Sequence, residues 1–209
     1  MSEKKSKFSI ASICRQITKV YLSTIKEYYE NNQFVGHNME KLITTYEIKG
    51  RHIDFYLNFT KKAGNFGHQI GGLFYPKQQK NRRYAIEITL KISKDFNPRC
   101  YSEVNLRIHS CLIHEVEHYL QKIKFPYREK LPRYDYKTTK DYINSLSEIE
   151  AYTKMLYFIH KKSKVNFCKL LIEEAENITD DEDLQILFMD NIINFIIRRK
   201  DLNLLKNIQ

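Results

Sequence analysis

The 209-residue chain has no tryptophan, only four prolines and six glycines, and no long apolar run. Its longest mostly apolar stretches, such as Ile192–Ile197, are far shorter than the roughly 20 residues that a membrane-spanning helix needs. The lysine-rich start, Met1–Lys7, is not followed by the apolar segment of a secretory signal, because polar and charged residues interrupt positions 8–20. We therefore expect no membrane span and a cytoplasmic location.

Cysteine is scarce and scattered along the chain. Cys14, Cys100, Cys111 and Cys168 lie far apart and form no C-x-x-C pair, which excludes a cysteine zinc cluster and a thioredoxin-like site. The chain is long enough to bury a core without disulfides, and its 42% hydrophobic residues are typical of a folded globule. We expect reduced, mostly buried thiols.

Acidic residues are fewer than basic residues. The 35 Lys and Arg residues outnumber 25 Asp and Glu residues, so the formal net charge is +10, which favours anionic partners. Much of the excess lies in two stretches rich in loop residues, Lys61–Arg83 and Lys122–Lys140. The simplest interpretation is a pair of solvated basic loops, and the alternative is that these loops bind nucleic acid or an acidic partner.

The spacing of apolar residues predicts a mixed first half of the chain. A three- and four-residue spacing predicts a helix over residues 9–31, and β-type runs around Lys49-Gly50 predict a hairpin within 45–59. Four glycines between positions 64 and 72 indicate bends. Strict alternation predicts a strand over Tyr84–Ile92, with one face in the core and the other wet or facing a cleft.

Helical spacing dominates the second half, over residues 102–122, 146–162, 166–177 and 181–200. No internal repeat or low-complexity linker separates the two halves. The expected fold class is therefore α+β, with a small N-terminal mixed sheet and a helical C-terminal half. We place the main domain at residues 1–165 and a C-terminal helical lobe, packed on the same domain, at 166–209.

The candidate chemistry lies in the sequence His114-Glu115-Val116-Glu117-His118, an H-E-x-x-H pattern within a predicted helix. Four residues advance an α-helix by about 400° and about 6 Å, so both imidazoles lie on nearly one face and can reach one zinc ion. Glu115 is then beside the metal, where a carboxylate can act as general base toward a zinc-bound water. The pattern therefore predicts Zn²⁺ as cofactor and amide hydrolysis as chemistry.

A catalytic zinc site of this type needs a third protein ligand. The metzincin arrangement is rejected, because its Gly and His positions are occupied here by Gln121 and Lys124. Downstream, the next predicted helix begins with Ser147-Glu148-Ile149-Glu150-Ala151-Tyr152. An H-E-x-x-H helix followed by a helix with Glu-Ala resembles the gluzincin branch of zinc metallopeptidases, and in particular small intracellular or phage-encoded zincin-like peptidases.

This resemblance covers about Tyr84 to His160 and implies a minigluzincin-like domain. It implies that His114, His118 and Glu150 bind zinc, with Glu148 as the alternative third ligand. It also implies that an edge strand holds the backbone of a protein or peptide substrate by strand addition. One position departs from the family: Lys154 stands where the best-known gluzincins have an acid that orients a zinc-bound imidazole, so that support must come from elsewhere.

Two functions follow as expectations. The first is a zinc-dependent peptidase that cleaves a protein substrate, with Glu115 as catalytic base. The second is a nucleic-acid or protein binding module on a zincin-derived scaffold, with weak or no hydrolysis, in which the basic loops contact the partner.

Overall fold

The computed structural model describes residues 10–31, 33, 41–61, 69–75, 83–92, 101–125 and 136–200. The chain divides into two compact units, Met1–Val116 and Glu117–Gln209, and the division falls inside helix α2 (Tyr101–Lys124). The boundary predicted between residues 165 and 166 falls within the second unit. None of the described helices is both long and apolar enough to cross a membrane.

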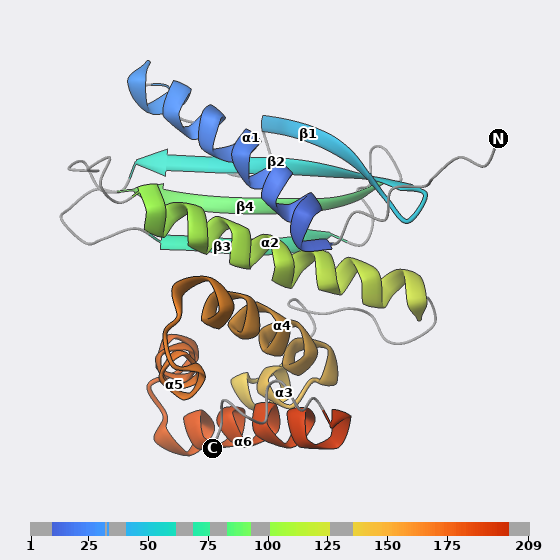
Figure 1. Cartoon of the computed structure of the whole chain (residues 1–209), viewed down its shortest axis with the longest axis vertical. Coiled ribbons are helices and arrows are strands. Elements are labelled where there is room, and N and C mark those ends of the chain that lie inside the picture. The colour runs from blue at the N-terminus through green and yellow to red at the C-terminus, as the bar shows by residue number, and fades with distance from the viewer. Residues whose placement is uncertain are drawn as a thin grey trace. The chain divides into compact units, whose positions relative to one another are not determined.

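The first unit contains a four-stranded mixed sheet in the order β1-β2-β4-β3. Its strands are β1 (Lys41–Ile48), β2 (Arg51–Lys61), β3 (Gln69–Tyr75) and β4 (Tyr84–Ile92). The central pair β2 and β4 is parallel, whereas β1 and β3 are antiparallel to their neighbours. Helix α1 (Ile10–Glu30) and helix α2 lie across one face of this sheet (Figure 1). The predicted α+β class with a small mixed sheet is confirmed.

A two-residue turn joins β1 to β2. Both Lys49 (φ 55°) and Gly50 (φ 73°) have positive φ, as the hairpin turn that matches the right-handed twist of paired strands requires. The structure thus confirms the hairpin predicted at this dipeptide and extends its strands beyond the predicted 45–59.

The two faces of the sheet differ in chemistry. One face is apolar and fully buried, with Phe55 and Leu57 of β2 beside Ile86 and Ile88 of β4. On the opposite face, Glu87 accepts hydrogen bonds from Asn58 Nδ2 (3.2 Å), Thr89 Oγ1 (3.2 Å) and Tyr75 Oη (3.3 Å). Glu87 is only 5% exposed, so the expectation of a wet polar face is wrong at this residue.

Strand β3 was not predicted, because its glycines were interpreted as bends. Gly71 and Gly72 are instead paired with Thr89 and Ile88 of β4. A Cβ atom on Gly72 would lie 2.7 Å from Glu115 Cγ, so this glycine allows β3 and α2 to approach closely. Gly64 and Gly67 lie outside the described residues.

The described residues of the second unit that follow α2 are mainly helical. It contains α3 (Thr139–Ile143), α4 (Leu146–Ser163), α5 (Phe167–Ile178) and α6 (Glu182–Arg199). The last three confirm the predicted helices to within a few residues, whereas the short α3 was not predicted. Side-chain oxygens of Asn166 and Asp181 accept hydrogen bonds from backbone N–H groups in the first turns of α5 and α6, which explains where these helices begin.

The buried thiol of Cys14 provides a test of the first unit's core. Cys14 is fully buried, and its burial raises the pKa of the thiol to about 12, whereas Cys168 is partly exposed. Because the thiolate is the reactive form, we expect Cys14 to resist iodoacetamide at pH 8 in the native protein and to react in denaturant. Peptide mass spectrometry measures both rates. Native alkylation of Cys14 as fast as that of Cys168 would contradict the packing of α1.

Candidate metal site

Helix α2 carries the H-E-x-x-H residues as predicted. His114, Glu115 and His118 are 3%, 2% and 4% exposed, and the helix continues unbroken through all three. Val116 and Tyr119, on other faces of this helix, are fully buried. The apolar residues therefore fix the rotation of the helix, while the two imidazoles lie one turn apart along it.

The third residue of the group comes from the first turn of α4. Ligand atoms of His114, His118 and Glu148 all lie within 4.8 Å of one another, and all three residues are buried. His118 Nε2 and Glu148 Oε2 are 3.3 Å apart, with the Glu148 side chain only 1% exposed. This group could hold a metal ion.

The donor set fits a divalent transition metal. Two donors that each lie 2.0–2.2 Å from a tetrahedral ion are roughly 3.3–3.6 Å apart, and the 3.3 Å separation of His118 and Glu148 meets this condition. Two imidazole nitrogens and one carboxylate oxygen also form a known set for catalytic zinc, which leaves a fourth position for water.

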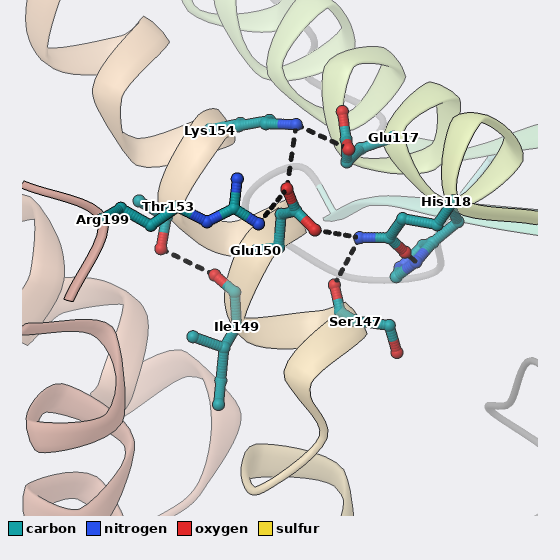
Figure 2. Close-up of polar contacts among 9 residues, drawn as sticks. Glu117, His118, Ser147, Ile149, Glu150, Thr153, Lys154 and Arg199 are labelled. Carbon is teal, nitrogen blue, oxygen red and sulfur yellow. Dashed lines mark hydrogen bonds and ion pairs between the residues drawn. The ribbon is translucent and has the colours of Figure 1, made fainter. Parts of the chain in front are cut away.

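Glu150, the predicted third ligand, has other partners. Figure 2 shows Lys154 and Arg199 in contact with its carboxylate. Oε1 lies 3.4 Å from Lys154 Nζ and 3.3 Å from Arg199 Nη2, and Oε2 accepts from Gln121 Nε2 at 3.4 Å. Residues two apart on an α-helix point about 200° apart, so Glu148 and Glu150 cannot both face the histidines. The structure brings Glu148, not Glu150, to His114 and His118.

Lys154 bridges two acids. Its Nζ lies 2.6 Å from Glu117 Oε1 in addition to its contact with Glu150 (Figure 2). The imidazole of His118 is instead contacted by Gln121, whose Oε1 lies 3.2 Å from Nδ1. This contact is not predicted from the sequence, although three residues of separation on one helix already place the two side chains on neighbouring positions.

Glu115 is packed against the backbone of β3. A Cβ atom on Gly72 would lie 2.8 Å from Glu115 Oε1 and 2.7 Å from its Cγ, closer than such atoms approach in folded proteins. The carboxylate of the predicted general base is therefore confined by an edge strand.

The predicted basic loops fall largely outside the described residues. Positions 62–68, 76–82 and 126–135, which make up most of Lys61–Arg83 and much of Lys122–Lys140, are not described. Among the described parts, Arg83 lies 3.6 Å from the buried Asp54, where it pairs with an acid of its own sheet.

No protein-family model, curated protein or solved structure matches this chain. The interpretation of the site therefore depends on its own geometry.

The two adjacent glycines of β3 provide a matched pair of variants. Gly72→Ala places a methyl group into buried Glu115, so we expect it to lower the free energy of unfolding by about 1–3 kcal/mol. Gly71→Ala meets nothing within 4 Å and should change stability little. Urea denaturation followed by circular dichroism measures both. Equal stability of the two variants would show that the Glu115 side chain can move aside and is not confined by β3.

Proposed function

We propose that this protein is a zinc-dependent peptidase in which His114, His118 and Glu148 hold the metal and Glu115 is the general base. The observation that supports the proposal is the buried group of two imidazoles and one carboxylate on two different helices. When bound, zinc lowers the pKa of a coordinated water to about 7 and polarises the carbonyl that is attacked.

Each residue has a distinct task in this mechanism. His118 and Glu148 provide donors from α2 and α4, and His114 provides a donor one helical turn before His118. Glu115, about 100° further round α2 than His114, takes the proton of the attacking water and delivers it to the leaving amine. Confinement by Gly72 limits the positions that this carboxylate can adopt.

Strand β3 supports the choice of an extended peptide as substrate. It forms one edge of the sheet and pairs only with β4 among the described strands. A peptide that adds to the side of β3 opposite β4 would form main-chain hydrogen bonds close to Gly72, whose neighbour is Glu115. The substrate class we propose is therefore a protein segment in extended conformation.

The choice of Glu148 over Glu150 is tested by zinc affinity. Loss of a residue that only supports a ligand typically weakens metal affinity 10- to 100-fold. Because Glu148 is the proposed ligand itself, we expect Glu148→Gln to weaken zinc binding by more than about 100-fold. Glu150→Gln should retain close to one zinc per chain. Elemental analysis by mass spectrometry and competition with a chromophoric chelator measure stoichiometry and affinity. The opposite order of effects would make Glu150 the ligand.

The general base is tested by a conservative variant. Glu115→Gln should retain zinc, and its rate of peptide cleavage should fall at least about 100-fold. A positioned acid–base group typically accelerates a reaction 10²- to 10⁴-fold. Mass spectrometry of a protein-derived peptide library detects cleavage without knowledge of the substrate. Glu103→Gln, at an exposed position of the same helix, is the matched control. Cleavage by Glu115→Gln at the parent rate would exclude this mechanism.

A further inference from the structure

We propose that Gln121 is a positioning residue that fixes the proton of His118 on Nδ1 and thereby directs Nε2 to the metal, and that Glu150 holds Gln121 in place. This inference rests on the proposed metal site. The residues involved, from His118 to Arg199, all belong to the second unit of the chain.

The orientation of the Gln121 amide follows from its partners. Gln121 Nε2 lies 3.1 Å from the backbone oxygen of Ser147 and 3.4 Å from Glu150 Oε2. A backbone carbonyl has no proton to donate, so the NH₂ group of Gln121 must face Ser147. The amide oxygen then faces His118.

This orientation selects one form of the imidazole. Gln121 Oε1 lies 3.2 Å from His118 Nδ1, and a carbonyl oxygen can only accept, so Nδ1 must carry a proton and donate it. The other ring nitrogen, Nε2, is the atom that lies 3.3 Å from Glu148 Oε2 in the metal group. In the neutral ring its lone pair is therefore available to the ion.

Two cations hold Glu150 in the geometry that Gln121 needs. Lys154 comes from the next turn of α4 and Arg199 from the last turn of α6, and both approach Oε1, which leaves Oε2 for Gln121 (Figure 2). Lys154 is held in turn by Glu117 of α2 at 2.6 Å. Arg199 and Lys154 thus act on His118 through Glu150 and Gln121, in place of the acid that the family resemblance leads one to expect at position 154.

The test compares two substitutions of Gln121. Gln121→Met has a similar size but no acceptor, and we expect zinc binding 10- to 100-fold weaker than in the parent, as for other residues that orient a metal-bound imidazole. Gln121→Glu retains an acceptor for Nδ1, and it is combined with Glu150→Gln so that the new amide at position 150 can donate to the new carboxylate at 121. This double variant should stay within about 10-fold of the parent. The matched control is Gln185→Ala, which removes a similar side-chain hydrogen bond, to Thr179 O, away from the group.

A second measurement reports the imidazole directly. In the zinc-loaded, ¹⁵N-labelled protein, the Nδ1 proton of His118 should be observed in the parent, in the double variant Gln121→Glu with Glu150→Gln, and in Gln185→Ala. It should exchange faster with water in Gln121→Met. A purely structural role of Gln121 would weaken folding without this selective change, and thermal melting of the apo variants measures folding separately.

The outcomes separate the two proposals. If the parent protein binds no zinc, the metal site is wrong and the role of Gln121 is wrong with it. If the parent binds zinc and Gln121→Met matches it in affinity and in Nδ1 proton exchange, only the role of Gln121 is overturned. Should Gln121→Met fail to fold, the double variant Gln121→Glu with Glu150→Gln decides the question. Retained zinc affinity and a retained Nδ1 proton support the proposal, and loss of both overturns it.

Discussion

The close approach of His118 to Glu148 is the interaction on which the candidate site depends. Both side chains are almost completely buried, where a charged group that lacks a partner costs several kcal/mol. A divalent cation held by His118, Glu148 and the nearby His114 would provide the compensation that such burial requires. Without this contact, α2 would present two histidines and α4 a glutamate, and neither helix would form a metal site by itself.

Two acids near the start of α4, Glu148 and Glu150, have different neighbours. Glu148 faces the histidines, while Glu150, about 200° round the helix, faces Lys154 and Arg199. The ion pairs of Glu150 are only partly exposed, and their role in the proposed site is geometric: they hold the acceptor that fixes the Gln121 amide. In the proposed site, Glu150 would thus support the ligand His118 and would not itself bind the metal.

Much of the fold could be predicted from local patterns. The helix at 10–30, the Lys49-Gly50 turn and strand β4 follow from short-range periodicity and turn chemistry, which the structure retains. Strand β3 could not be predicted, because glycine has low strand propensity and Gly72 is placed by the approach of Glu115, a residue 43 positions away. The burial of Glu87 was missed for a similar reason, since its three hydrogen-bond donors come from three strands.

The sequence by itself determined the candidate motif: a helix that carries His114, Glu115 and His118 one turn apart needs only the α-helical repeat. The resemblance to gluzincins added the expectation that a carboxylate comes from residue 150 or 148, at the start of the next long helix. Only the tertiary structure decided between Glu148 and Glu150, because the rotation of α4 about its axis is set by packing against other helices. The same packing brings Arg199, from the far end of α6, to Glu150, and no local pattern in the sequence contains that contact.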